Sequence, residues 1–278
     1  MGSDIHQVSA YIIHVGAVRK LTHLHSRSGE PTWSAVTASP VAPSWANSVT
    51  WARADILKPA TYQRYLVGSD AVVHSMGILL EADYKGVVSG RESIVSGLQR
   101  AFSPTKIGTS RNPLEEDELR PGERYGQITY ELMNRDTAIS LARSANEAGA
   151  ETFVYISAAA AAPILPNRYI TTKREAESTI ASSLPQLRSI FVRPGFLYDS
   201  SRKFTIPIAL GGFAGHAANS LIGGRLSGLM GAAVEKPLKA DVVAEAVVEA
   251  IAQDDCRGVV NTKQIEDLAT KAWRKTML

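Results

Sequence analysis

The chain has 278 residues, of which 45% are apolar and 21% are charged, and these proportions are ordinary for a soluble globular protein. The net charge of +3 is too small, and not gathered in any Lys/Arg block, to indicate a nucleic-acid-binding protein, so we expect no nucleic-acid partner. The single cysteine, Cys256, excludes an intrachain disulfide framework, and the histidines show no zinc-ligand spacing, so we expect no metal.

Short apolar runs alternate with longer segments of helical spacing, a pattern typical of βαβ units and a parallel sheet. The expected strands are, in chain order, Tyr11–Val15, Ser48–Ala54, Asp70–Ser75, Thr152–Ser157, Arg188–Arg193 and Gly258–Asn261. The expected helices are Pro59–Leu66, Thr129–Asn146, Tyr169–Ala181, Asp241–Ala252 and Ile265–Trp273. The pattern predicts an α/β fold with a Rossmann-type doubly wound parallel sheet.

Two stretches interrupt this pattern. Residues 81–128 are polar and rich in Gly, Ser and Pro, which predicts a flexible insertion. Phe204–Gly224 contains no Asp, Glu, Lys or Arg and has nearly the length of a bilayer span, but Pro207, several glycines and Asn219 interrupt it. We therefore favour a lid, or a patch that touches a membrane or an apolar substrate, over a transmembrane helix. The predicted organisation is a Rossmann-like domain over 1–200 and a small C-terminal substrate or interaction lobe over 201–278.

Three residues point to acid/base chemistry. Tyr169 and Lys173 are four positions apart, so a helix places them on one face, and Ser157 ends the strand before them. An ammonium group beside a phenol favours the phenolate, which lowers the pKa of the tyrosine. A serine hydroxyl nearby would hold the reacting oxygen of a substrate. An exposed helix pair and an ordinary strand-end serine are the structural alternatives.

These residues stand in an order that resembles the extended and atypical branch of the short-chain dehydrogenase/reductase superfamily. The resemblance implies Ser157, Tyr169 and Lys173 as catalytic residues, with Tyr169 as general acid/base and Lys173 also holding the cofactor ribose. Asn134 matches an Asn of the helix before them. The implied cofactor-binding residues are Asp55, His74, Ser75, Gly77, Tyr169, Lys173, Pro194, Gly195 and Phe196.

Longer segments of the sequence resemble those of the fungal mitochondrial proteins linked to ubiquinone biosynthesis, which are relatives of the dehydrogenase-like accessory subunit of respiratory complex I. The segments include Val73–Glu81, Tyr130–Asn134, Tyr169–Glu177 and Val192–Phe196. This resemblance implies a mitochondrial location on the matrix side of the inner membrane. It also implies quinone-biosynthesis proteins as partners, with residues 204–224 as a contact with the membrane surface. The weakly basic N-terminal residues alone identify no presequence, and they hold no long apolar run typical of a secretory signal.

The N-terminal residues depart from this family. Its members open with a strand and a glycine-rich turn that holds the cofactor pyrophosphate. Here Tyr11–Val15 and Gly16 would be a substitute strand and turn, with a single glycine and little room for the usual helix. We therefore expect an altered first strand and glycine turn. Arg27 lies in the segment Ser26–Pro31, which resembles the end of the family's second strand. An arginine there suits a 2′-phosphate and favours NADP over NAD, although a solvated arginine explains it equally well.

Two main hypotheses follow. In the first, the protein is an NAD(P)-dependent oxidoreductase or epimerase that acts in or supports ubiquinone biosynthesis. In the second, it is a non-catalytic structural component of a quinone-synthesis or respiratory complex, which the altered N-terminus favours. A soluble cytosolic epimerase or reductase is a third option.

Overall fold

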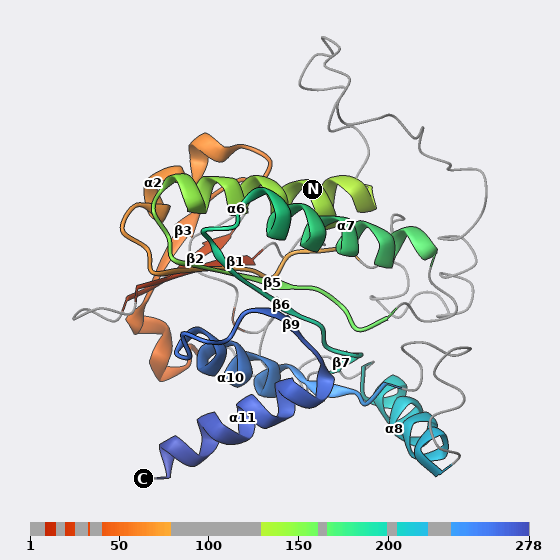
Figure 1. The fold of residues 1–278 in the computed structure, drawn as a ribbon. Helices are drawn as coiled ribbons and strands as arrows, with labels where there is room; N and C mark the ends of the chain where they lie inside the picture. The colour runs from red at the N-terminus through yellow and green to blue at the C-terminus, as the bar shows by residue number, and fades with distance from the viewer. Residues whose placement is uncertain are drawn as a thin grey trace, which may run out of the picture.

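The computed structural model describes residues 9–14, 20–25, 33, 41–78, 129–160, 166–198, 205–221 and 235–277. Within these ranges a sheet of seven strands lies between two layers of helices (Figure 1). The strands are β1 (Ser9–His14), β2 (Lys20–His25), β3 (Val49–Arg53), β4 (Ala71–His74), β5 (Thr152–Ile156), β6 (Arg188–Val192) and β9 (Gly258–Val260). Their spatial order is β3-β2-β1-β4-β5-β6-β9, the doubly wound order that the sequence predicts.

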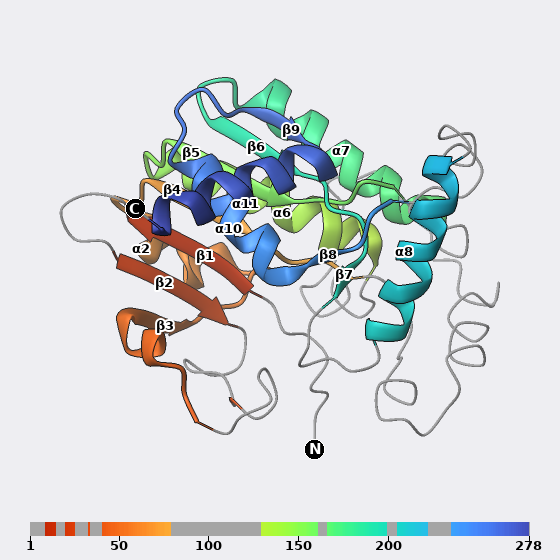
Figure 2. The same cartoon turned by 90° about the horizontal axis from the view of Figure 1, so that it is seen from below.

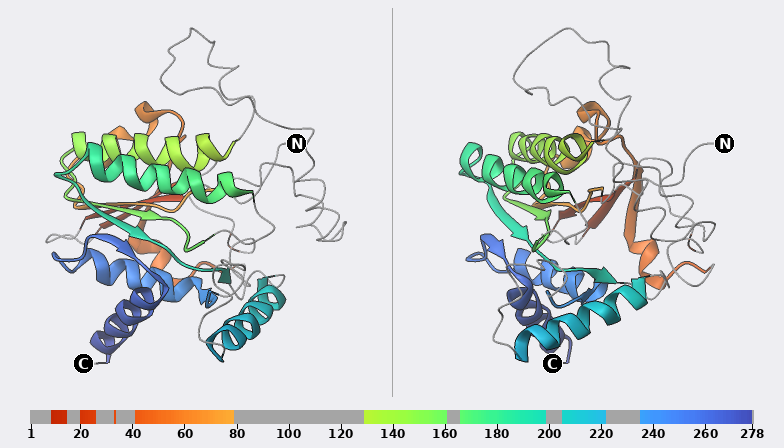
Figure 3. Two further views of the ribbon diagram at one scale, coloured as in Figure 1. Left: turned by 45° about the vertical axis from the view of Figure 1, so that its right-hand side comes forward. Right: turned by 90° about the vertical axis from the view of Figure 1, so that its right-hand side faces the viewer.

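Helices cover both faces of this sheet, as Figures 1 and 3 show. One face carries α2 (Gln63–Leu66), α6 (Thr137–Glu147) and α7 (Asn167–Ser183). The other face carries α10 (Ala240–Ile251) and α11 (Thr262–Thr276). Two 3₁₀ turns, η1 (Ser44–Ser48) and η2 (Pro59–Thr61), flank β3 in the chain, and a π-helical turn, η4 (Glu131–Asp136), precedes α6. The three-layer α/β architecture is therefore confirmed.

The central strands are buried on both sides, and alternate side chains enter different cores. Val72 of β4 and Phe153 of β5 belong to the core beneath α6 and α7, which also holds Leu141 and Ile180. The next residue of β5, Val154, belongs to the opposite core, beneath α10 and α11. Because side chains alternate across a strand, these continuous apolar runs fill both cores, as expected for strands in the middle of a parallel sheet.

The first strand lies in its expected central position but runs in the reverse direction. β1 pairs antiparallel with both β2 and β4, whereas β2–β3, β4–β5, β5–β6 and β6–β9 are parallel pairs. The reason is the short connection between β1 and β2, since a parallel crossover needs a dozen or more residues. Reversal places His14, the last residue of β1, at the edge where β4 begins, opposite to the edge that holds His74. The altered first strand is thus confirmed, and its end cannot serve as a phosphate turn beside His74.

The segment after residue 200 contributes to two parts of the structure. β9, α10 and α11 complete the main sheet and its helical cover. By contrast, α8 (Thr205–Leu221) lies at the margin of the molecule beside the small parallel pair of β7 (Leu197–Tyr198) and β8 (Leu238–Lys239) (Figure 2). Of the helices described, none combines the length and apolar content that a membrane crossing needs. The predicted insertion 81–128, Gly16 and Arg27 lie outside the described residues.

Candidate functional site

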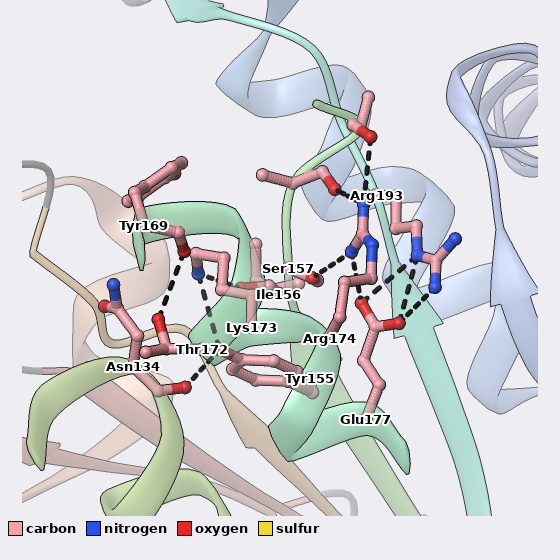
Figure 4. A network of polar contacts seen from close by, with 12 residues as sticks. Asn134, Tyr155, Ile156, Ser157, Tyr169, Thr172, Lys173, Arg174, Glu177 and Arg193 are labelled. Atoms are coloured by element: carbon pink, nitrogen blue, oxygen red, sulfur yellow. Dashed lines mark hydrogen bonds and ion pairs between the residues drawn. The ribbon is translucent and has the colours of Figure 1, made fainter. Parts of the chain in front are cut away.

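Lys173 is the centre of the candidate site. It lies on α7, and its side chain is buried, with 4% of the residue exposed. Its Nζ donates to the Tyr155 hydroxyl at 3.4 Å and to the carbonyl of Ile156 at 3.3 Å, both long contacts (Figure 4). Burial therefore lowers the pKa of Lys173 to about 8, although the Glu177 carboxylate opposes the decrease. Because its two hydrogen bonds are long and compensate its burial only weakly, the ammonium group of Lys173 is available to bind a further acceptor.

Asn134 fixes the chain that passes over this lysine. It lies in the π-helical turn η4, where its carbonyl accepts a hydrogen bond of 2.5 Å from the Tyr155 hydroxyl. Its side chain clamps the backbone of Ile78, accepting from the amide at 2.8 Å and donating to the carbonyl at 3.2 Å. A Cβ at the exposed Gly77 would lie 2.9 Å from Asn134 Oδ1 and 3.3 Å from Lys173 Nζ. The absence of a side chain at Gly77 is thus what allows the chain to lie directly over the lysine. π-helical turns inside helices are frequent at functional sites.

Tyr169 shares the same face of α7 but has a different electrostatic environment from the one predicted. Its ring is partly buried, edge-to-face with Tyr130 at 5.9 Å, and Lys173 Nζ lies 5.7 Å from its centroid. Burial raises the pKa of Tyr169 to about 12, and Arg174 opposes the increase. The prediction of a Tyr169 pKa lowered by Lys173 is therefore wrong for this structure. The physical reason is that burial disfavours the phenolate, while Lys173 Nζ turns inward to Tyr155 and Ile156.

Ser157 follows β5 and is paired with an arginine. Its hydroxyl accepts a hydrogen bond of 3.1 Å from Arg174, which also donates to the carbonyls of Ala158 and Ala159 at 2.6 and 2.9 Å. Figure 4 shows Ser157 on the Arg174 side of the cluster and Tyr169 on the other side of Lys173. The structure thus brings Tyr169 and Lys173 together on one helix face, whereas Ser157 belongs to a loop after β5 that Arg174 holds in place.

Arg174 is part of an ion-pair network that sequence reasoning missed. The buried Glu177 carboxylate accepts from Arg174 at 2.7 Å and from Arg193 Nε at 3.1 Å (Figure 4). The network links α7 to the end of β6 and to the loop after β5. A periodicity signal was available for Glu177, because Tyr169, Lys173 and Glu177 follow one another at intervals of four along one helix face. Nothing in the sequence pattern indicated the contact between Arg174 and Ser157.

The residues at the end of β4 that were expected to line the cofactor differ in their exposure. Ser75 and Gly77 are exposed beyond the end of β4, but His74 has no exposed surface. The Nε2 atom of His74 lies 3.1 Å from the Thr137 hydroxyl, its Nδ1 atom has no hydrogen-bond partner within the described part of the chain, and burial lowers its pKa to about 3. Since the Thr137 hydroxyl donates to the carbonyl of Met133, Nε2 must donate, and the lowered pKa keeps the ring neutral near pH 7. His74 thus shapes the end of the strand from inside the core.

The other residues expected to bind the cofactor, Asp55 and the segment 194–196, make contacts within their own surroundings. The Asp55 carboxylate accepts from the amide of Leu57 at 3.1 Å and lies 3.5 Å from Lys58, so it stabilises its own loop after β3. Gly195 allows a close approach, because a Cβ there would lie 2.9 Å from the carbonyl of Lys236. Its neighbour Pro194 is buried and Phe196 is half-buried.

Comparisons with known proteins give the family. No protein-family model matches the chain. The chain is 31% identical to MIOREX complex component 2 of Saccharomyces cerevisiae over 237 residues, which cover 80% of this chain and 82% of that protein. The chain belongs to the family of MIOREX complex component 2. In this member of the MIOREX component 2 family, Lys173, Asn134 and Gly77 form one compact cluster, while Ser157 is held by Arg174.

Solved structures are more distantly similar to this MIOREX component 2 relative. One is RMD from Pseudomonas aeruginosa complexed with NADPH, with a TM-score of 0.41 and 16% identity, covering 79% of this chain and 71% of that chain. Another is DesIV, a dTDP-glucose 4,6-dehydratase from Streptomyces venezuelae with NAD and TYD bound, with a TM-score of 0.45 and 14% identity, covering 91% and 70%. Scores at this level transfer no function.

Proposed function

We propose that the protein is a mitochondrial NAD(P)-binding, oxidoreductase-like protein that acts in or supports ubiquinone biosynthesis on the matrix side of the inner membrane. Within this proposal, Tyr169, Lys173 and Ser157 are the inherited reaction residues, and quinone-biosynthesis proteins are the partners. The family resemblance in the sequence supports the location and the pathway. Membership of the family of a complex component supports action within an assembly.

The observation that carries the nucleotide-binding proposal is the buried ammonium group of Lys173 beneath Gly77. This cluster lies at the carboxyl ends of β4 and β5, and ligands of doubly wound sheets bind at that edge. Lys173 would hold the ribose hydroxyls, while exposed Ser75 and Gly77 offer the chain segment against which the nicotinamide half would lie. The cofactor would supply the hydride chemistry. These residues therefore fit one half of the dinucleotide.

The diphosphate half is fitted less well by the described residues. A glycine turn followed by a helix supplies amide groups and a helix N-terminus to the phosphates. Here residues 15–19 alone join β1 to β2, and the carboxyl end of β1 lies at the opposite edge of the sheet. We therefore expect weaker dinucleotide binding than in proteins with that turn. NADP is favoured over NAD only by Arg27, which lies outside the described residues.

The second candidate is a non-catalytic component of a quinone-synthesis or respiratory complex. Two observations favour it: the hydroxyl of Ser157 is engaged by Arg174, and burial raises the pKa of Tyr169 to about 12. A phenol with that pKa remains protonated near neutral pH and is a poor general base. In this role the cluster around Lys173 would be a relic of the reaction site that binds a nucleotide without turnover.

Calorimetric titration with NADPH and with NADH tests the proposal. We expect at least one dinucleotide to bind, and we expect Lys173→Met to weaken that binding about tenfold or more through loss of a charged hydrogen-bond donor. Lys263→Met is the matched control, because Lys263 is exposed on α11, which covers the opposite face of the sheet from α7 (Figure 1). Absence of binding to the unmodified protein would refute nucleotide binding and favour the structural role.

A second measurement separates catalysis from binding. If the protein binds a dinucleotide, we expect multiple-turnover oxidation of that nucleotide with a quinone precursor, and we expect Tyr169→Phe to abolish it without abolishing binding. Unchanged turnover in Tyr169→Phe would remove the acid/base role. Fractionation of cells tests the location separately, and recovery of the protein outside mitochondria would contradict that part of the proposal.

A further inference from the structure

Tyr155 lies at the centre of the contacts around Lys173, although the sequence pattern did not indicate it as a site residue. It belongs to β5 and has no exposed surface. Its hydroxyl donates to the carbonyl of Asn134 at 2.5 Å (Figure 4). Because a phenol has one proton and Asn134 takes it, the oxygen of Tyr155 acts as the acceptor for Lys173 Nζ, 3.4 Å away. The hydroxyl therefore joins the π-helical turn η4 to the lysine.

The ring of Tyr155 is also fixed. It packs edge-to-face with the buried ring of His74, with centroids 5.4 Å apart, and His74 is in turn hydrogen-bonded to Thr137. Lys173 Nζ lies 5.0 Å from the centroid of the Tyr155 ring, within the range of a cation–π contact. The ammonium group thus meets negative charge density from both the oxygen and the ring, on a side chain that has little freedom to turn.

The contact with Asn134 extends the influence of Tyr155 to the chain above the lysine. While the carbonyl of Asn134 accepts from Tyr155, its side-chain amide holds the backbone of Ile78 through two hydrogen bonds, at 2.8 and 3.2 Å. The chain segment that lies over Lys173 is therefore tied to Tyr155 through one residue, Asn134. A displaced Tyr155 hydroxyl would alter both the ammonium group and the chain that covers it.

We propose that Tyr155 is a positioning residue of the nucleotide site, whose hydroxyl holds both the Lys173 ammonium group and the Asn134 backbone in place. This inference rests on the proposed nucleotide binding and adds a residue to that site. Because Tyr155 is fully buried, it acts on a bound nucleotide through Lys173 and not by contact. The oxygens of Tyr155 and Ile156 take two of the three ammonium protons, which leaves one for a ribose hydroxyl.

The first test needs no nucleotide. Lysine isotope-labelled at Cε reports the pKa of Lys173 by NMR, and Lys173→Met identifies its resonance. Tyr155→Phe keeps the ring and removes the acceptor oxygen, so the pKa of Lys173 should fall from about 8 by roughly half a unit. Both this variant and its control retain the other titratable or charged groups that face Lys173, which are His74 of β4 and Tyr169, Arg174 and Glu177 of α7.

The matched control is Tyr62→Phe. Tyr62 has no exposed surface and belongs to the same core, but its hydroxyl lies 3.4 Å from Ser140. We expect Tyr62→Phe to leave the pKa of Lys173 unchanged. An unchanged or raised pKa of Lys173 in Tyr155→Phe, or an equal decrease in Tyr62→Phe, would overturn the proposal.

A second measurement uses the unmodified protein and does not depend on the folding of a variant. A buried hydroxyl in a hydrogen bond of 2.5 Å should give a slowly exchanging, downfield proton resonance. That resonance of Tyr155 should shift with the same pH midpoint as Lys173, because Nζ is 3.4 Å from the oxygen. A Tyr155 resonance that does not respond to the titration of Lys173 would contradict the proposed contact.

Calorimetry then relates Tyr155 to nucleotide binding. A decrease of half a unit in the pKa of Lys173 should weaken the binding of NADPH or NADH by Tyr155→Phe about twofold at pH 8 and much less at pH 7, because fewer molecules hold the ammonium group at pH 8. An equal loss at both pH values would show a merely structural role and overturn the proposal. If the unmodified protein binds neither dinucleotide, the nucleotide site itself is refuted, while the two NMR measurements still decide whether Tyr155 holds Lys173.

Discussion

Lys173→Met should stabilise the folded protein at neutral pH. The lysine is 4% exposed, and its pKa decreases from about 10.5 to about 8 because burial disfavours the charged form. At about 1.4 kcal/mol for each unit of pKa, this difference corresponds to a cost of about 3 kcal/mol at pH 7. Methionine fills a similar volume without a charge. The two hydrogen bonds that Nζ donates are long, at 3.3 and 3.4 Å, so their removal costs little.

The sign of the pH dependence distinguishes this cause from a simple packing effect. Between pH 8 and pH 10.5 the unfolded chain holds the Lys173 proton and the folded chain does not, so the stability contributed by Lys173 increases as pH rises. The advantage of Lys173→Met should therefore decrease, from about 3 kcal/mol at pH 7 to about 1.5 kcal/mol at pH 9.5. Urea denaturation of both proteins at the two pH values measures it.

The control is Lys263→Met, which should change stability by less than about 0.5 kcal/mol at both pH values because Lys263 is exposed. A destabilised Lys173→Met variant, or a gain independent of pH, would show that the folded protein compensates the buried ammonium group. In that case Lys173 would cost no stability, and its burial would no longer support a role in binding.

Three further predictions concern the surroundings of Lys173. Glu177→Gln should lower the free energy of unfolding by about 3 kcal/mol, measured by urea denaturation, because it leaves Arg174 and Arg193 without their carboxylate partner. Glu175→Gln, in an exposed pair with Arg135, should lower it by less than about 1 kcal/mol. Equal losses in the two variants would contradict this. Gly77→Ala should cost about 1–3 kcal/mol in the same assay, because its Cβ would lie 2.9 Å from Asn134 Oδ1, and a silent change would refute that packing. Burial lowers the pKa of His74 from 6.5 to about 3, so between these pH values the unfolded chain binds a proton that the folded chain does not, and the free energy of unfolding should decrease as pH falls. NMR should find the His74 ring neutral at pH 5.

Most strands of the main sheet were predictable from the sequence because their signals are local, but β2, β7 and β8 had no predicted range. The apolar runs of β4, β5 and β6 are bounded by polar residues, and each strand lies within one or two residues of its predicted range. The direction of β1 was harder, because the residues Tyr11–Val15 suit a strand of either direction. Only the length of the connection to β2 decides between them.

The position of Tyr169 and Lys173 on one helix face was predictable, but the contacts of their side chains were not. Spacing along α7 placed Tyr169 and Lys173 on one face, which the structure has. The contacts of Ser157 with Arg174 and of Lys173 with Tyr155 join segments 17 or 18 positions apart in the chain, and the orientation of both side chains depends on packing. The pKa of Tyr169 was not predictable for the same reason, since a helix interval fixes a face but not the direction in which an ammonium group points.

The reversed β1 has a practical consequence for handling this protein. Its first residue, Ser9, pairs with His25 at the end of β2, and Ala10 pairs with His74 at the end of β4. Any polypeptide joined ahead of Ser9 therefore enters the sheet at the same edge as Gly77. The other terminus follows α11, which begins after β9 at that edge and runs back across the face of the sheet (Figure 1). A fusion placed directly ahead of Ser9 would lie beside the site under assay, whereas one after α11 would leave it open.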